Sequence, residues 1–417
     1  MNVVLSIGYG RLHLVQSAVW LAKAGCKVRL VCGWVPRNAD GLLVRVCSRI
    51  VGRDLSHGLK KRLIQAEGVA TLSMPLVEFL NQGVRTASRL LHIPSHLSAS
   101  LMWSLFGFCS RRYIKKSFIF HCRSGAGQGG AIRRAQRIGI KVLVDHSALH
   151  PAKSEQNLKD DYARWGQRVA ISPKAGVWKN VVADCQDADM IMVNANHIRD
   201  SFIEQGYSPE RLRVVYLGVR SDFFGLKMSY ALRDRMRILY TGTFSILKGA
   251  EYTLEAVRIL VERGVNVQLD VYGLLDAPIA LREKYRDCPV VYHGAVPQDD
   301  LKAALAESDV YLFPSLADGC AQSGMEALAA GLPVVATYQS GLPITDGETG
   351  CVVPMKDAVM IADKLEWLKA HEDERERIGR NAAKMIAENY TWEKYAENVK
   401  RIYDELGRES QGYKEVK

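Results

Sequence analysis

The sequence lacks the features that define several specialised classes of protein. Its nine cysteines, an odd number, show no CxxC spacing, which argues against a disulfide scaffold or a zinc ribbon and favours a reducing cytoplasm. No run of about 18 apolar residues occurs, so we expect no transmembrane helix. The first residues, MNVVLSIGYG, contain no basic segment or cleavage site, so we expect no secretory signal. Apolar residues make up 48% of the 417 residues and charged residues 24%, which excludes a disordered, collagen-like or coiled-coil chain.

Acidic residues are scarce in the first part of the chain. Residues 1–150 hold 22 Lys and Arg against 5 Asp and Glu, whereas residues 151–417 hold 34 against 40. This imbalance indicates that the N-terminal half faces an anionic partner, such as a membrane surface or a phosphorylated substrate. Solvated surface charge without a partner is the alternative. Nucleic acid is a weaker candidate, because the basic segment lacks a recognisable aromatic RNA-binding module.

Apolar β-branched runs alternate with amphipathic helical segments in two series. The first series has its strand-like runs at 3–8, 27–33, 118–122, 141–147, 188–195 and 212–218. The second has them at 237–242, 267–273, 290–294, 309–315 and 333–337. This alternation predicts an α/β protein with two doubly wound, Rossmann-like domains, each built on an open parallel sheet. Such domains bind ligands at the carboxyl ends of their strands, here in a cleft between the domains.

The domain boundaries follow from the same pattern. We expect an N-terminal domain over 1–220, a linker over 221–236, a second domain over 237–390 and a closing helical segment over 391–417. Residues 42–118 fit the pattern least, because they mix basic with apolar and aromatic residues. Such helices suit a contact with a membrane surface. A helical insertion that packs on the first sheet is an equal alternative, and the two are compatible.

The first strand is followed by a short glycine loop, GYGRLH. Gly8 and Gly10 match the start of a dinucleotide fingerprint, but His13 stands where the third glycine would be. The second strand ends in Cys32-Gly33-Trp34, without an acidic residue for a ribose hydroxyl, so NAD binding is disfavoured. Gly10 can still offer a backbone N–H to a phosphate, although a tight strand-to-helix turn is an equally good interpretation.

The second series contains a better candidate for binding phosphate. In TGTFSILKGAEYTLEA (241–256), a strand ends at Gly242 and Lys248-Gly249 opens a helix. A lysine beside the positive end of a helix is unfavourable by itself, but both positive groups favour a bound diphosphate. An exposed first-turn lysine is the alternative.

The most informative stretch is PSLADGCAQSGMEALAAGLPVVAT (314–337). Its loop carries Asp318 and its helix, expected over 322–330, carries Glu326. A carboxylate can accept hydrogen bonds from two neighbouring sugar hydroxyls. Before the helix, the loop offers N–H groups that can hold phosphate oxygens, those of Cys320, Ala321 and Gln322. A capping aspartate and a helix-surface glutamate are the default alternatives for the two acids.

Residues 237–350 resemble the donor domain of family 4 retaining glycosyltransferases, which have the two-domain GT-B fold. The resemblance rests on the order of GTFSILKG, LDVYG, VVYHGAV, LAESDVYLFPS, DGCAQSGMEALAAGLPVVAT and GETGCVV. The N-terminal half is compatible through VDHSALHP, DDYARW, ADMIMVNANHIRDSFIEQG and VVYLGV. The resemblance implies a GT-B fold whose C-terminal helix, with Trp392, crosses back to the first domain.

The resemblance also implies roles for individual residues. Glu326 would bind the ribose of a nucleotide-sugar, and Asp318 would contact the transferred sugar. Lys248 would bind the diphosphate, with backbone help from Gly10. The backbone around Val296 would touch the base, and His150 would lie near the reacting sugar.

Two positions depart from the family pattern. Thr243 stands in the donor site where many members have an arginine, so stabilisation of the leaving group would depend on Lys248 and the helix dipole. Asp318 replaces the first glutamate of the family's E-x7-E and is one methylene shorter. No DxD-like motif stands at the donor site, and we expect no required metal and no cofactor other than the donor substrate.

The sequence therefore predicts a hexosyltransferase that moves a sugar, with retention of configuration, from a nucleotide-diphosphate sugar to a glycan or lipid-diphosphate-linked acceptor. We expect it to act in bacterial cell-surface polysaccharide or lipopolysaccharide synthesis. Its expected place is the cytoplasm, as a peripheral protein on the inner face of the plasma membrane. The alternatives are a weakly active or inactive GT-B binding subunit, motivated by Thr243 and Asp318, and a nucleotide-sugar epimerase.

Overall fold

The computed structural model divides the chain into two compact units. Unit 1 consists of Met1–His146, Ser172–Met192 and Ala396–Lys417, and unit 2 consists of Ser147–Ile171 and Val193–Tyr395. The structure describes the whole chain except residues 11–12, 37–40, 42–44, 46–47, 50–55, 57–62, 65, 93–94, 116–118, 233 and 416–417.

The first sheet has seven strands in the order β3-β2-β1-β4-β5-β6-β7. The strands are β1 (Asn2–Gly8), β2 (Lys27–Cys32), β3 (Val69–Ser73), β4 (Ile119–Arg123), β5 (Lys141–His146), β6 (Met190–Val193) and β7 (Leu212–Val214). Strand β1 runs parallel to both its neighbours, with Val4 opposite Arg29 on one side and Phe120 on the other. All but the first residue of β1 is buried, as expected for a parallel strand that helices cover on both faces.

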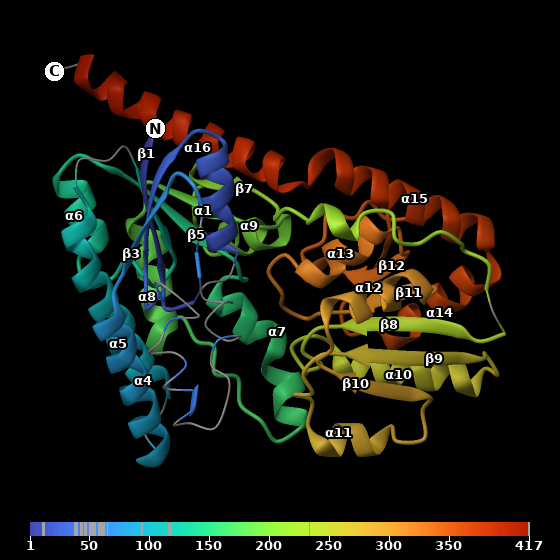
Figure 1. Cartoon of the computed structure of the whole chain (residues 1–417). Coiled ribbons are helices and arrows are strands. Elements are labelled where there is room, and N and C mark those ends of the chain that lie inside the picture. The colour runs from blue at the N-terminus through green and yellow to red at the C-terminus, as the bar shows by residue number, and fades with distance from the viewer. Residues whose placement is uncertain are drawn as a thin grey trace. The chain divides into compact units, whose positions relative to one another are not determined.

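Helices cover both faces of this sheet. Figure 1 shows α1 on one side of the strands and α5 and α6 on the other. The helices of unit 1 are α1 (Leu14–Lys23), α4 (Pro75–Leu90), α5 (Ser95–Ser110), the 3-10 turn η1 (Arg111–Tyr113), α6 (Ala131–Arg137), α8 (Gly176–Asp187) and most of α16 (Trp392–Glu415). Helix α5 packs between α4 and α8 and also contacts β1.

The second sheet has six strands in the order β10-β9-β8-β11-β12-β13. They are β8 (Met236–Thr241), β9 (Val267–Tyr272), β10 (Val290–Gly294), β11 (Val310–Phe313), β12 (Val334–Thr337) and β13 (Cys351–Val353). Every neighbouring pair in this sheet is parallel. The carboxyl ends of these strands therefore meet along one edge, which is where doubly wound sheets bind ligands.

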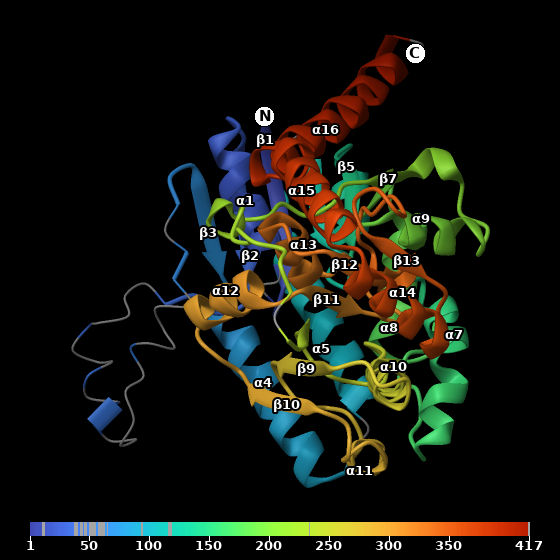
Figure 2. The same cartoon turned by 90° about the vertical axis from the view of Figure 1, so that its right-hand side faces the viewer.

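The helices of unit 2 also lie on both faces of their sheet. Figure 2 shows α10 and α14 on one side of the strands and α12 on the other. The helices are α7 (Pro151–Arg164), α9 (Asn196–Ile203), α10 (Ala250–Glu262), α11 (Ile279–Lys284), α12 (Gln298–Glu307), α13 (Gln322–Ala330), α14 (Ala358–Ala370) and α15 (Glu372–Asn389). Three 3-10 turns complete the unit: η2 (Pro209–Arg211), η3 (Ser221–Phe223) and η4 (Tyr338–Ser340).

The two predicted series of parallel strands are confirmed. The pattern did not predict β3 or β13. The burial of β3 is only partial, and it lies in the part of the chain, 42–118, that fits the alternation least. Within 42–118 the described residues form β3, α4, α5 and η1, and α5 packs on the first sheet as a helical insertion would. Most of the basic segment 58–65 lies outside the described residues.

Residues 221–236, which were expected to form the linker, belong to unit 2 and pack against its other residues. Phe223 is fully buried. The ammonium of Lys227 donates to the carbonyl of Ser308 (2.6 Å), and the hydroxyl of Tyr230 donates to the carbonyl of Gly331 (2.7 Å). These contacts hold the segment that precedes β8 against the residues that follow α12 and α13.

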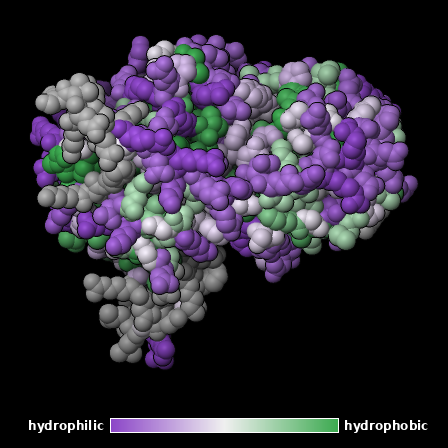
Figure 3. Space-filling model, turned by 90° about the horizontal axis from the view of Figure 1, so that it is seen from above, coloured by the Kyte–Doolittle hydropathy of each residue, from purple (hydrophilic) through white to green (hydrophobic). Residues whose placement is uncertain are grey.

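Within the described part of the chain, no helix combines the length and hydropathy that a membrane crossing requires. On the face seen in Figure 3, hydrophilic side chains predominate and hydrophobic atoms form separate groups.

Candidate active site

Two loops at the carboxyl edge of unit 2's sheet bring the predicted residues together. One follows β8 and leads into α10, and the other follows β11 and leads into α13. They touch at Gly249, whose φ is 79° and where a Cβ would lie only 2.0 Å from the carbonyl oxygen of Pro314. Only glycine fits this position, and it places Lys248 against the second loop.

Lys248 and Asp318 form an ion pair. Both side chains are partly accessible, with 23% of Lys248 and 17% of Asp318 exposed. The other oxygen of the carboxylate, Oδ1, accepts a hydrogen bond from the N–H of Gly319 (2.7 Å). The ammonium also lies 5.8 Å from the centre of the Phe313 ring. The Asp318 carboxylate therefore neutralises the charge of Lys248. An anion that binds Lys248 would have to displace this carboxylate.

Backbone hydrogen bonds hold the loop that carries Asp318. Nε2 of His197 donates to the carbonyl of Asp318 (2.8 Å), and the amide of Asn157 donates to the carbonyl of Leu316 (3.1 Å). Burial lowers the pKa of His197, so this histidine is neutral and acts as a donor at neutral pH. Sequence reasoning did not identify it, because it lies 121 residues from Asp318.

Helix α13 starts at the predicted residue, Gln322. Cys320 and Ala321 are buried just before it, and burial raises the pKa of the Cys320 thiol to about 12. The Gln322 amide donates to the carbonyl of Gly218 (3.3 Å). The first N–H groups of a helix have no partner within it and carry a partial positive charge, so this end of α13 favours an anion.

Glu326 is half-buried on α13. Burial raises the pKa of its carboxyl to about 7, a shift that Arg220 opposes and Asp222 reinforces. In the described residues its carboxylate has no hydrogen-bond or ion-pair partner. A half-buried, unpaired carboxyl group is costly for folding and is available to bind a polar ligand.

A cluster of charges that the sequence did not indicate lies near Glu326. The guanidinium of Arg220 donates to Asp222 through Nε (3.1 Å) and to the amide oxygen of Gln298 (2.9 Å). Lys302 pairs with the other carboxylate oxygen of Asp222 (2.7 Å). The charged segment after residue 218 is the only signal in the sequence that could have pointed to it.

Thr243 and Val296 also follow strands of this sheet. Thr243 is exposed after β8, and its carbonyl accepts from the hydroxyl of Tyr240 (3.0 Å). Val296 is half-buried just after β10. Both residues therefore lie at the carboxyl edge that carries Lys248 and Asp318.

The comparisons with known proteins agree with this geometry. The family described as "Glycosyl transferases group 1" matches residues 235–371, which include both loops. The amylovoran biosynthesis glycosyltransferase AmsK of Erwinia amylovora is 33% identical over 317 residues, which cover 72% of this chain and 73% of that protein. The chain belongs to the group 1 glycosyltransferases.

Other similarities cover more of this glycosyltransferase. The alpha-D-kanosaminyltransferase of Streptomyces kanamyceticus is 27% identical over 416 residues, or 88% of this chain and 99% of that protein. Sucrose-phosphate synthase from Thermosynechococcus elongatus has a TM-score of 0.64 at 16% identity, over 97% of this chain and 99% of that one. Anabaena HepE, in complex with UDP and glucose, has a TM-score of 0.62 at 14% identity, over 97% and 100%. The fold is GT-B, as the sequence resemblance implies.

His150, the histidine predicted near the reacting sugar, is buried in the structure. His150 is 4% exposed and caps α7, with its Nδ1 accepting from the N–H of Ala152 (3.3 Å). Its ring packs edge-on against Phe202, and burial lowers its pKa to about 4. The other histidine of VDHSALHP, His146, ends β5 at the carboxyl edge of the first sheet, where it shares a hydrogen bond with the hydroxyl of Ser124 (2.8 Å).

Gly10 lies in unit 1, just after β1. A Cβ at this position would lie 2.5 Å from a guanidinium nitrogen of Arg123. The guanidinium is buried beside the ring of Trp103, 5.0 Å from its centre, and burial lowers its pKa. A cation therefore already stands beside the loop where a phosphate contact was predicted.

Among the residues that the structure describes, no group of three or more histidine, cysteine, aspartate or glutamate side chains has the arrangement of a metal site.

Proposed function

We propose that this glycosyltransferase moves a hexose-type sugar from a nucleotide-diphosphate sugar to a glycan or lipid-diphosphate-linked acceptor, with retention of configuration. The observation that carries the proposal is the Lys248–Asp318 pair, partly accessible at the sheet edge in the loops that lead into α10 and α13. A diphosphate replaces the carboxylate as the partner of Lys248, and the released Asp318 accepts hydrogen bonds from the hydroxyls of the transferred sugar.

The first turn of α13 completes the diphosphate site in this proposal. The N–H groups of Cys320 and Gln322 lie at this end of the helix, whereas the N–H of Ala321 donates to the carbonyl of Ser340 (3.2 Å) and serves the diphosphate only if that bond opens. In the proposal, the helix end and Lys248 act on one leaving group. Charge stabilisation by fixed donors is the largest contribution in many enzymes. Thr243 can contribute only its backbone and hydroxyl groups. Lys248 therefore provides the charge stabilisation of the leaving group that it would share with an arginine at position 243.

The reaction exchanges one C–O bond for another. The acceptor oxygen attacks the anomeric carbon on the face of the leaving group, the bond from that carbon to the phosphate oxygen breaks, and the nucleoside diphosphate departs. The proton of the acceptor hydroxyl passes to the departing phosphate. Glu326 holds the ribose and the backbone at Val296 contacts the base. Gly10 would assist the diphosphate from unit 1, and His150 would act on the sugar only by shaping the loop before α7.

Relatives support the donor and acceptor classes. HepE was solved with UDP and glucose, so UDP-sugars are the first donors to test. Curated relatives include AmsK, of amylovoran biosynthesis, and the capsular polysaccharide biosynthesis glycosyltransferase CapM of Staphylococcus aureus. We therefore propose a role in cell-surface polysaccharide or lipopolysaccharide synthesis. The excess of Lys and Arg in residues 1–150 supports the further proposal that the enzyme acts in the cytoplasm, as a peripheral protein at the inner face of the plasma membrane.

The proposal requires no metal and no cofactor besides the donor. A direct test incubates the full-length enzyme with a panel of nucleotide-sugars and measures slow hydrolysis of the donor, with and without EDTA. The expected result is nucleotide release from one donor that EDTA leaves unchanged and Lys248→Ala abolishes. Loss of activity in EDTA, restored by a divalent cation, would contradict the metal-free reaction.

The same assay separates the alternatives. Conversion of the donor sugar into its epimer without acceptor would identify an epimerase. Tight nucleotide binding without hydrolysis or transfer would identify a binding subunit. Transfer or hydrolysis that disappears in Glu326→Ala excludes a binding subunit.

A further inference from the structure

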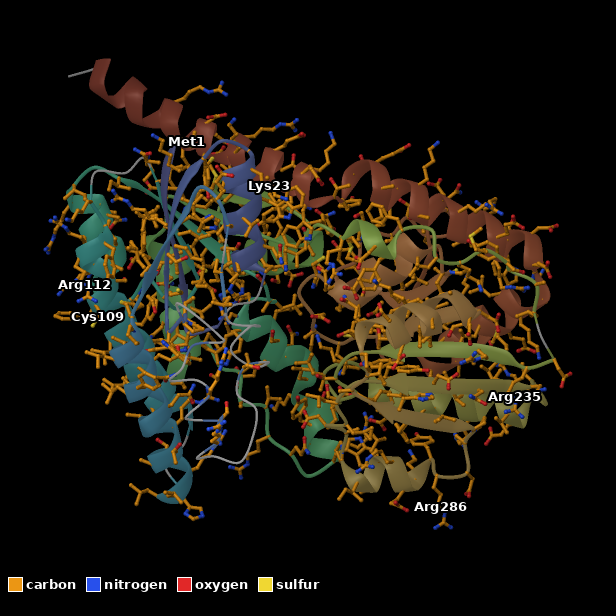
Figure 4. The ribbon with its side chains drawn as sticks, viewed as in Figure 1. Met1, Lys23, Cys109, Arg112, Arg235 and Arg286 are labelled. Carbon is orange, nitrogen blue, oxygen red and sulfur yellow. The ribbon has the colours of Figure 1, made fainter. Side chains whose placement is uncertain are left out.

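Unit 1 contains a cavity of about 740 Å³ on its flank, between the end of α5 and α6. Its lining combines Arg111, Arg112 and Lys115, which precede β4, with residues of α6 and of the loop between β4 and α6. Figure 4 labels Arg112 beside Cys109 at this end of α5, with α6 next to them. The cationic residues that line the cavity are Arg111, Arg112, Lys115, Arg133, Arg134 and Arg137.

The charges of the cavity are unbalanced. Asp187 is the single carboxylate among the described residues that line it. Arg133, Arg134 and Arg137 lie exposed on one short helix and have no ion-pair or hydrogen-bond partner in the described part of the chain. Arg111 and Arg112 stack on Phe108 and Tyr113, 3.9 and 4.7 Å from the ring centres. Stacking fixes the planes of these two guanidinium groups and leaves their charge without a counterion.

Close backbone packing fixes the walls of the cavity. A Cβ at Gly107 on α5 would lie 1.6 Å from the carbonyl oxygen of Gln128, and one at Gly129 would lie 1.9 Å from that of Ser104. The buried carboxylate of Asp184 accepts hydrogen bonds from the N–H groups of Gly125 (2.6 Å) and Gly127 (2.8 Å). The loop between β4 and α6 is therefore held firmly against α5, and the arginines on either side keep their spacing.

We propose that this cavity is a binding site for a ligand that carries clustered phosphate groups, such as a pyrophosphate or a phosphorylated headgroup. Guanidinium groups bind phosphate through paired N–H donors. Like charges gathered in a concave surface raise the local potential and attract a multivalent anion. The site uses six of the 22 Lys and Arg residues of residues 1–150, and it does not depend on the donor site of unit 2.

Inorganic pyrophosphate is the probe for the first experiment, with binding to the full-length protein measured by calorimetry at low ionic strength. The cavity variant is Arg133→Gln/Arg134→Gln. Its matched control is Arg401→Gln/Arg408→Gln, which removes the same charge from exposed positions of α16. We expect the cavity variant to weaken pyrophosphate binding at least tenfold and the control to leave it unchanged, because only the first pair can contact the ligand.

Lys248→Ala separates this site from the donor site. Pyrophosphate binding that is lost in Lys248→Ala but intact in the cavity variant would overturn the inference and leave the proposed function standing. Binding that persists in Lys248→Ala and is lost in the cavity variant supports the inference whatever the donor site does.

A vesicle experiment identifies the source of the phosphate. Sedimentation with phosphatidylcholine vesicles is compared with and without phosphatidylglycerol. Binding only to the anionic vesicles, reduced in the cavity variant and not in the control, assigns the site to a lipid headgroup. Pyrophosphate binding without vesicle binding assigns it to a soluble or acceptor-borne phosphate. Equal behaviour of the cavity variant and the control in both experiments, or no binding in either, would overturn the proposal.

Discussion

Each unit of this glycosyltransferase carries an aspartate at the carboxyl edge of its sheet, but the two are held differently. In unit 1, Asp145 on β5 is 2% exposed and lies 3.1 Å from Nε2 of His13 and 3.7 Å from Nε2 of His121. In turn, Nδ1 of His121 shares a hydrogen bond with the hydroxyl of Tyr403 on α16 (2.7 Å). In unit 2, Asp318 is 17% exposed and pairs with Lys248 alone among charged side chains that the structure describes.

This difference indicates which of the two aspartates can bind a ligand. Burial by itself would raise the pKa of Asp145, but His13 and His121 outweigh it and hold the pKa well below its ordinary value. The Asp145 carboxylate therefore links β5 to the start of α1 through His13 and to α16 through His121 and Tyr403. The Lys248–Asp318 pair is partly accessible to solvent, so a substrate can reach both groups and replace each as the partner of the other.

The largest predicted effect is on stability in unit 1. Asp145→Ala should lower the free energy of unfolding by about 3–5 kcal/mol, because it breaks a buried charged network. Urea unfolding followed by circular dichroism measures the change. Asp404→Ala, at an exposed position of α16, is the control and should cost less than about 0.5 kcal/mol. Similar losses of stability in Asp145→Ala and Asp404→Ala would contradict the structural role given to Asp145.

The next effect is on catalysis in unit 2. Lys248→Ala should reduce kcat/KM for sugar transfer by roughly 10²–10³, the usual cost of removing one stabiliser of a leaving group. Steady-state kinetics with the identified donor give the value. Arg286→Ala, at a side chain that is 72% exposed and labelled in Figure 4, should leave the rate unchanged. A Lys248→Ala enzyme with normal kcat/KM would remove the lysine from the mechanism.

The pH dependence of unit 2 should follow Glu326. Its folded-state pKa is about 7 against an ordinary value of 4.5, so between these values the folded protein keeps a proton that the unfolded chain releases. Rising pH therefore lowers the free energy of unfolding in that window. Glu326→Gln removes this contribution, and its stability relative to the wild type should rise by about 1–3 kcal/mol from pH 4.5 to pH 7. A pH-independent difference in urea unfolding would show that Glu326 has an ordinary pKa.

The smallest effect is on the stability of the open pair. Asp318→Asn should change the free energy of unfolding by less than about 1 kcal/mol, since an ion pair that solvent still reaches contributes little and the asparagine keeps the oxygen that accepts from Gly319. The same urea experiment applies, with Asp145→Asn as the comparison. A loss for Asp318→Asn as large as that for Asp145→Asn would mean that the donor-site pair is structural.

The donor-site elements were largely predictable from the sequence because their signals are local. Helix α13 was predicted over 322–330 and is observed over Gln322–Ala330, where an apolar face ends at Gly331. Lys248 and Asp318 were each singled out from a strand, loop and helix pattern, and the two loops do meet.

The residues that the sequence did not reveal depend on long-range contacts. Strand order and the return of α16 bring together His13, His121, Asp145 and Tyr403, although His121 and Tyr403 lie 282 positions apart in the sequence. Of the two histidines in VDHSALHP, His146 ends β5, and His150, which was predicted near the sugar, is buried and caps α7. Periodicity does not encode such placements.

The central claim is that Lys248, Asp318 and Glu326 form a nucleotide-sugar site. The most direct measurement is a thermal-shift screen of the full-length protein against UDP, GDP, ADP and their common sugars, with Glu326→Ala in parallel. A ligand that binds only the folded state raises the melting temperature. The account predicts a shift with one nucleotide and its sugars that disappears in Glu326→Ala. A shift of equal size in the variant, or none with any nucleotide, would contradict it.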